Sequence, residues 1–109
     1  MNALLIVTTA DSESLARSIA SALVEAGEAA CVNILPGVRS VFRWQGEICN
    51  EEEFLLMIKT AAANWEAVRS RIRQLHSYQI PEVIAVPITA VDPDYLNWLA
   101  MQVKDAEQD

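Results

Sequence analysis

Residues 29–60 read AACVNILPGVRSVFRW, then QG, then EICNEEEFLLMIKT, which makes two long and largely apolar arms around a glycine. β-Branched and aromatic residues favour strands, and a dipeptide that ends in glycine between two such arms is typical of a tight turn. We therefore predict a long antiparallel hairpin that turns at Gln45-Gly46. Pro36-Gly37 interrupts the first arm. Because proline cannot donate a ladder hydrogen bond, this interruption predicts a bulge or bend on an edge strand.

The length of the hairpin and its register both have consequences. Each arm has roughly 14 residues, against about 5–6 in a usual strand, and spans roughly 45 Å at strand rise. The tip is thus expected to extend beyond its own domain and to pack on a neighbouring subunit. With a two-residue turn, opposed residues have numbers that sum to about 91, which pairs Cys49 with Phe42 and Cys31 with Thr60. The two thiols would then lie roughly 35 Å apart, whereas a disulfide requires Cα atoms within about 7 Å.

The segments on either side of the hairpin supply two more strands. Residues 3–9 (ALLIVTT) and 83–88 (VIAVPI) are short apolar runs without helical spacing. Such runs are typical of strands that are buried on both faces. Pro87 lies inside the second run and therefore predicts an edge position or a bulge there.

Three helices are predicted from apolar stripes at helical spacing. The stripes are Leu15, Ile19, Leu23 and Ala26; Trp65, Val68, Ile72 and Leu75; and Leu96, Leu99 and Val103. The residues expected to cap the N-termini are, in order, Asp11 or Ser12, Asn64, and Asp92 followed by Pro93. Gly27 is expected in the left-handed conformation that ends the first helix.

The resulting order is β-α-β-β-α-β with one helix appended, which predicts a ferredoxin-like α+β fold in a single domain over residues 1–109. In this fold the two main helices cover only one face of a four-stranded sheet. The strands nevertheless look apolar on both faces. The bare face is therefore expected to meet other protein, which predicts an oligomer.

Composition excludes several classes of function. A net charge of −7 argues against nucleic acid and against an anionic membrane surface as partners. The chain shows no signal peptide and no run of about 20 apolar residues. The two cysteines lack CxxC or zinc-ligand spacing, which suits a reducing compartment and predicts a cytoplasmic protein. The absence of a nucleophile–His–acid set, of HExxH and of a P-loop predicts that the protein is not an enzyme.

Four blocks of sequence, taken in order, resemble the CutA divalent-ion-tolerance family. They are ILPGVRSVFRWQGEI, EEEFLLMIKT, LHSYQIPEVIAVPI and DYLNWL, and the likeness runs over residues 2–103. The resemblance implies a ferredoxin-like fold in a tight homotrimer, related in architecture to the PII signalling proteins. It also implies a link to copper and other divalent cations.

The same resemblance singles out His76 as the candidate metal ligand. In family members credited with copper binding, the proposed ligands are a thiol on the first strand and a histidine pair before a proline-tyrosine motif. Here the corresponding positions are Val7 and Leu75-His76, and Ser77 replaces the usual proline before the tyrosine. Only His76 carries over, for Cu²⁺ or another divalent cation, and no other cofactor is implied. The alternative interpretation is that His76 is a helix C-terminal residue favoured by the helix dipole.

Other polar side chains have two interpretations each. Glu51 and Glu53 share a strand face and could bind a hard cation, or could be solvated or paired across subunits. Arg69 and Arg73 lie one helical turn apart, near Glu66, as a solvated face or, less commonly, an anion site.

The thiols and the aromatic residues of the hairpin complete the set of candidates. Cys31 is expected to be a packed small apolar residue, and Cys49 is ambiguous. Phe42 and Trp44 share a face near the tip and are expected to anchor an interface.

Three classes of function are compatible with these features. The first is a trimeric protein that responds to divalent cations, copper among them, by binding metal without catalysis. The second is a PII-like small-molecule sensor that uses clefts between subunits, for which a glycine-rich or basic anion cradle would be expected. The chain has only three glycines and no obvious cradle. The third is a structural or partner-binding trimer.

Overall fold

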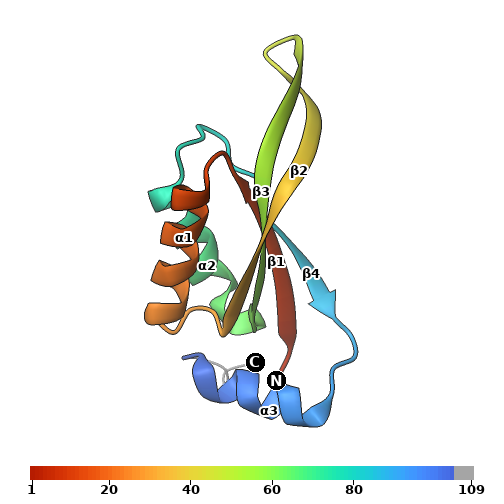
Figure 1. Ribbon diagram of the computed structural model, residues 1–109. Coiled ribbons are helices and arrows are strands. Elements are labelled where there is room, and N and C mark those ends of the chain that lie inside the picture. The colour runs from red at the N-terminus through yellow and green to blue at the C-terminus, as the bar shows by residue number, and fades with distance from the viewer. Residues whose placement is uncertain (105–109) are drawn as a thin grey trace.

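The computed structural model describes residues 1–104 and shows the predicted ferredoxin-like α+β architecture (Figure 1). Its strands form one antiparallel sheet in the order β2-β3-β1-β4. The elements are β1 (Ala3–Ala10), α1 (Glu13–Glu25), β2 (Cys31–Trp44), β3 (Glu47–Ala61), a 3-10 turn (Ala62–Asn64), α2 (Trp65–Leu75), β4 (Ile84–Ile88) and α3 (Pro93–Gln102). β2 and β4 lie at the edges, which is where the prolines inside both strands predicted them to be.

The turn between β2 and β3 forms at the predicted dipeptide. Gln45 and Gly46 have φ values of 51° and 83°, and positive φ at both central residues is the signature of the type I′ turn that suits a hairpin. The turn joins the longest strands of the sheet, of 14 and 15 residues. The molecule is 44 Å long but only 25 and 21 Å across. Figure 1 shows the hairpin projecting past the helices, so the prediction that it outreaches its own domain is confirmed.

A bulge in β2 changes the predicted register by one residue. The pairing shifts between Leu35 and Val38, around the predicted Pro36-Gly37 interruption. On the tip side of the bulge Phe42 pairs with Cys49, as predicted. Beyond it, Cys31 pairs with Lys59 and not with Thr60, because the bulge places one extra residue in β2.

Helix α1 begins and ends as its sequence predicts. The Oγ atom of Ser12 accepts a hydrogen bond from the Leu15 N–H at 3.1 Å, which makes Ser12 the capping residue. Gly27 follows the last turn with a φ of 70°, and the Glu28 N–H donates to the Leu23 carbonyl oxygen at 2.9 Å. This is the Schellman arrangement, which needs a residue that tolerates the left-handed region.

Helices α1 and α2 pack side by side on one face of the sheet and enclose the core (Figure 1). The largest apolar side chains there are completely buried: Ile6, Ile19, Leu23, Leu56, Ile58, Val68 and Ile72. A second, smaller cluster forms where α3 covers the end of the sheet, around Ala61 and Leu99.

Asn64 precedes α2 but does not cap it through its side chain, so that prediction is wrong. The 3-10 turn has already bent the backbone at Asn64 to φ −93° and ψ 5°, whereas a capping residue is normally extended. Its amide nitrogen donates instead to Thr60 Oγ1 at 3.3 Å and to the Lys104 carbonyl oxygen at 2.8 Å. Asn64 therefore ties the end of β3 to the chain segment after α3. The predicted cap of α3 is confirmed, since Asp92 Oδ2 accepts from two backbone N–H groups.

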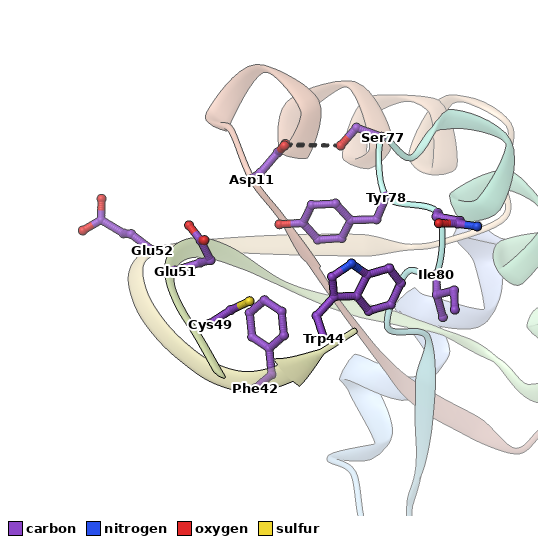
Figure 2. A pocket seen from close by; sticks show the side chains of 10 residues that line it. Asp11, Phe42, Trp44, Cys49, Glu51, Glu52, Ser77, Tyr78 and Ile80 are labelled. Carbon is purple, nitrogen blue, oxygen red and sulfur yellow. Dashed lines mark hydrogen bonds between the residues drawn. The ribbon is translucent and has the colours of Figure 1, made fainter. Parts of the chain in front are cut away.

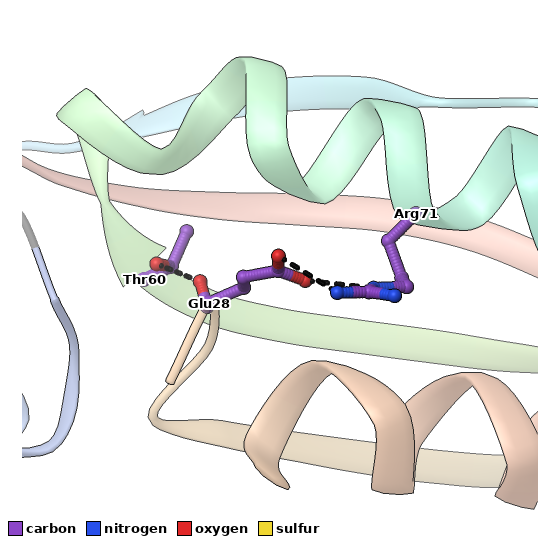
Figure 3. Close-up of polar contacts among 3 residues, drawn as sticks. All are labelled: Glu28, Thr60 and Arg71. Carbon is purple, nitrogen blue, oxygen red and sulfur yellow. Dashed lines mark hydrogen bonds and ion pairs between the residues drawn. The ribbon is translucent and has the colours of Figure 1, made fainter. Parts of the chain in front are cut away.

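A buried carboxylate joins the loop after α1 to α2 and β3 (Figure 3). Glu28 is only 7% exposed, and its two carboxylate oxygens accept from Arg71 Nε at 3.0 Å and from an Arg71 terminal nitrogen at 3.1 Å. The Glu28 backbone oxygen accepts from Thr60 Oγ1 at 2.6 Å. The hydrogen bond to Glu28, and then the charge of Glu28, raise the pKa of the Arg71 guanidinium. Arg71 thus holds a fixed position, apart from the more exposed pair of Arg69 and Glu66.

The other face of the sheet has no helix over it, and its apolar residues remain accessible (Figure 1). The register pairs Val7 with Met57 and with Ile84, so these side chains share that face. Ile84 and Val86 are 52% and 48% exposed. In a single chain the two helices reach only one face, as predicted, and burial of the other face by a neighbouring chain stays a prediction. No helix within residues 1–104 is long and apolar enough to cross a membrane.

Candidate functional site

His76 lies where the chain leaves α2, and both of its ring nitrogens are engaged in hydrogen bonds. The backbone N–H of Tyr78 donates to Nδ1 at 3.1 Å, and Nε2 lies 2.6 Å from the carbonyl oxygen of Thr9 in β1. A carbonyl oxygen can only accept and a backbone N–H can only donate. The hydrogen-bond pattern therefore assigns the ring proton to Nε2 of a neutral imidazole.

This arrangement constrains any metal role for His76. A metal ion needs an imidazole lone pair, so ligation by either nitrogen would require one of the two hydrogen bonds to break. Within residues 1–104, no group of at least three histidine, cysteine or acidic side chains is arranged to hold a metal ion. His76 also follows the last residue of α2, and its backbone N–H donates to the Ile72 carbonyl oxygen. Metal ligation by His76 remains a prediction.

Tyr78 reaches from the loop after α2 to a nearly buried carboxylate on β3. Its hydroxyl donates to Glu53 Oε2 at 2.5 Å, and Glu53 is only 5% exposed. Burial raises the pKa of the Tyr78 hydroxyl well above its ordinary value, and so do the hydrogen bond to Glu53 and the charges of Glu53, Asp11 and Glu51. The hydroxyl therefore stays protonated and continues to donate to Glu53.

The hairpin and the loop after α2 together form a pocket of about 570 Å³ (Figure 2). Its walls are Asp11, Phe42, Trp44, Cys49, Glu51, Glu52, Ser77, Tyr78, Gln79 and Ile80. A second hollow of about 380 Å³ shares Phe42, Trp44, Tyr78 and Ile80 with it and reaches Glu53 and Glu82. Ser77 closes one side through a hydrogen bond of 3.4 Å to Asp11, drawn in Figure 2.

Only some of the residues predicted as site candidates lie close together in the structure. Glu51 and Glu53 do share a strand face, but only Glu53 is buried. Cys49 lines the pocket, while Cys31 lies at the far end of the hairpin. Cys31 is not the packed core residue that was predicted. It is partly exposed, and its Sγ atom donates to Asn33 Oδ1 at 3.8 Å.

Sequence reasoning did not identify Tyr78 or Asp11 as members of a site. Tyr78 follows the histidine that ends a helix, in a loop before Pro81, and Asp11 follows directly after β1. Polar residues at such element boundaries were the available signal. The segment LHSYQIP carries part of the family resemblance, which by itself does not place Tyr78 in a pocket.

Comparison with known proteins gives one consistent result. Residues 4–102 match the family model described as CutA1 divalent ion tolerance protein. The chain belongs to this family. The divalent-cation tolerance protein CutA of Thermus thermophilus is 46% identical over 94 residues, which cover 86% of this chain and 91% of that protein.

Solved structures of family members have the same fold. The Thermus thermophilus protein Cut A1 superposes with a TM-score of 0.90 at 42% identity, covering 93% of this chain and 98% of that one. CutA from Xylella fastidiosa superposes with a TM-score of 0.92 at 38% identity, covering 95% and 100%. The family resemblance found in the four sequence blocks is therefore confirmed, as is the fold that it implied.

Proposed function

We propose that the protein acts as a homotrimer in tolerance of divalent cations, with copper as the first candidate, and that it binds metal without catalysing a reaction. The observation that carries this proposal is family membership over residues 4–102, since the similar proteins are named for divalent-cation tolerance. We also propose the cytoplasm as its location, on the basis of the two cysteines that lack a pairing logic. The test in cells is growth in raised copper, with and without this chain, of a host that lacks its own family member.

The bare face of the sheet supports the trimer. Leu35, Ile84 and Val86 are between 39% and 52% exposed there, which leaves an apolar surface that a monomer would have to hydrate. Three copies that turn these faces inward would cover them. Analytical ultracentrifugation at micromolar concentration is expected to show a trimer, and a stable monomer would contradict the proposal.

The metal site requires ligands from more than one chain, or a rearrangement of His76. No sufficient group of ligands converges within residues 1–104, and transition-metal sites normally draw several nitrogen or sulfur donors. We keep His76 as the proposed ligand. Calorimetric titration of Cu²⁺ into the assembled protein is then expected to show weaker binding in His76→Ala. Binding should also weaken in acid, because the neutral imidazole is the ligand form.

Gln74→Ala is the matched control, because it removes an exposed polar side chain from the same turn of α2 and leaves His76 in place. Copper affinity that is unchanged in His76→Ala would remove this residue from the proposal. A wild-type protein that binds no copper would remove metal binding altogether.

A PII-like small-molecule sensor is the second candidate, and the pocket beside the hairpin favours it. The anion cradle that such a sensor would need is not found in this pocket, because no glycine, lysine or arginine within residues 1–104 lines either hollow. The third possibility is the structural or partner-binding trimer, whose cellular role would survive the loss of metal binding.

A further inference from the structure

The pocket beside the hairpin combines aromatic rings with carboxylates. The rings of Phe42, Trp44 and Tyr78 line both of its hollows. Figure 2 shows them gathered around one space, with the Glu52 carboxylate turned away from it. No lysine or arginine within residues 1–104 contributes to the lining of either hollow. The walls thus present apolar ring surface and negative charge together.

Glu53 is a nearly buried carboxylate that has no cationic partner within residues 1–104. It is 5% exposed, and one of its oxygens accepts from the Tyr78 hydroxyl. No ion pair joins Glu53 to a basic side chain in the described part of the chain. A carboxylate that is withdrawn from water is costly unless an opposite charge compensates it, and a neutral hydroxyl supplies a hydrogen bond but no charge. This corner of the pocket therefore lacks one positive charge.

The neighbouring acidic groups act in the same direction. Asp11, Glu51 and Glu52 line the first hollow, and Glu53 and Glu82 line the second, so the charged side chains of both hollows within residues 1–104 are all acidic and make the potential there negative. A negative potential attracts cations and repels anions.

The kinds of ligand can be separated on these grounds. The carboxylates repel an anion, and an uncharged apolar molecule would leave Glu53 uncompensated. An inorganic cation finds no sufficient ligand group within residues 1–104 and gains no ligand atom from a hydrocarbon ring. An organic ammonium or guanidinium group can use both features, because it is attracted to an aromatic face within about 6 Å as well as to a carboxylate.

We infer that this pocket binds a small organic cation, a free molecule with an ammonium or guanidinium group, between the rings of Trp44, Phe42 and Tyr78 and the carboxylate of Glu53. No cationic side chain within residues 1–104 stacks on these three rings. The one cation–π contact in the described part of the chain is elsewhere, with Lys59 Nζ 5.9 Å from the Tyr95 ring centre. The inference does not depend on metal binding or on His76.

The experiment uses choline as the probe and 3,3-dimethylbutanol as its uncharged equivalent of the same shape. Both are titrated into the full chain in its native assembly, followed by calorimetry and tryptophan fluorescence. Choline is expected to bind at least about tenfold more tightly than the alcohol. Glu53→Gln keeps an acceptor for Tyr78 but removes the charge, and should weaken choline binding at least about tenfold. Glu25→Gln removes an exposed carboxylate on α1 and should have no effect.

A second pair of variants tests the ring. Trp44→Leu should weaken choline binding by about 2- to 30-fold, while Trp98→Leu, on α3, should leave it unchanged. Both variants are compared at concentrations at which ultracentrifugation shows a full assembly, so that a loss of choline binding is not a loss of assembly. Choline and copper are titrated separately into the wild-type protein, so this inference and the proposed metal function can fail independently. Circular dichroism checks that each variant is folded. If Glu53→Gln does not fold, the tryptophan pair decides the question.

Three results would overturn the inference. The first is equal affinity for choline and 3,3-dimethylbutanol, and the second is no choline binding by the wild-type protein. The third is dissociation of the assembly by choline in ultracentrifugation, because a basic side chain of a neighbouring copy would then be the natural occupant of the pocket.

Discussion

Replacement of Asn64 by serine separates two roles that this residue could have. Serine is as good a helix cap as asparagine, so a capping residue should tolerate the change, whereas alanine should cost about 0.5–2 kcal/mol. In the structure the Asn64 side chain is fully buried and does not cap α2. Its amide instead donates two hydrogen bonds, to Thr60 Oγ1 and to the Lys104 carbonyl oxygen, and a serine hydroxyl is too short to make both. Asn64→Ser and Asn64→Ala should therefore destabilise the protein alike.

The expected cost is about 1–2 kcal/mol in the free energy of unfolding. Two neutral hydrogen bonds contribute about 0.5–1.5 kcal/mol each. The expected cost is smaller than the largest sum of the two, because the oxygen atom of the same amide offsets part of the loss. Asn64 Oδ1 is buried and has no hydrogen-bond partner within residues 1–104, so the wild-type side chain already carries a penalty that both variants remove. For a domain of about 100 residues, such a loss lowers the melting temperature by roughly 4–8 °C per kcal/mol.

Thermal and urea unfolding at one fixed protein concentration measure this loss, since association makes stability concentration-dependent. Limited trypsin digestion adds a local measurement, because cleavage after Lys104 requires the hydrogen bond from Asn64 to the Lys104 carbonyl oxygen to open. Both variants should be cut there faster than the wild type. If Asn64→Ser has wild-type stability while Asn64→Ala is destabilised, Asn64 does not stabilise the protein by joining Thr60 to Lys104, and the capping role is restored.

Three further predictions concern the hairpin and its surroundings. Trp44→Ala should weaken assembly more than the fold of one chain, by up to about 3–5 kcal/mol if a neighbour fully buries the ring; a fully trimeric variant with the wild-type melting temperature would contradict this. Because the pKa of Tyr78 is raised, its contribution to stability is complete below about pH 10 and is lost as the pH rises toward the raised pKa. Tyr78→Phe should remove that alkaline loss, as measured by unfolding against pH, and an identical alkaline profile would argue against it. Mass spectrometry of the unreduced, denatured protein should find two free thiols per chain, and a peptide cross-linking Cys31 to Cys49 within one chain would contradict the hairpin register.

The fold was predictable because its signals are local and agree with one another. The type I′ turn needs positive φ at two residues, and glycine at the second of them indicates such a turn in the sequence. Edge prolines and the Schellman glycine work in the same way, since each follows from the backbone chemistry of a single residue. The cap of α2 was predicted wrongly because a 3-10 turn lies directly before this helix, and no residue type in that segment indicates such a turn. The contact from Asn64 to Lys104 spans 40 positions in the sequence, so no local pattern could reveal it.

The site was harder to predict because its members come from three separate segments. His76 stood out as the single histidine, yet its ring is used to fix the loop that carries Tyr78 against β1. Glu53 was grouped with Glu51 by strand alternation alone. Its burial and its hydrogen bond from Tyr78, 25 positions further along the chain, are tertiary features that strand alternation does not reveal.

The bulge in β2 shows why the surroundings of the tip aromatics could not be read from alternation. Alternation places Phe42 and Trp44 on the same face as each other, whatever happens earlier in the strand. Whether that face is the helix-covered one depends on counting residues back through Pro36-Gly37, where a single extra residue reverses every side chain. The observed register pairs Leu35 with Leu55 and then Val38 with Glu53. Phe42 and Trp44 thereby share the face of Glu53, away from the helices, and an aromatic pair expected to anchor an interface also becomes one wall of a pocket with a carboxylate in it.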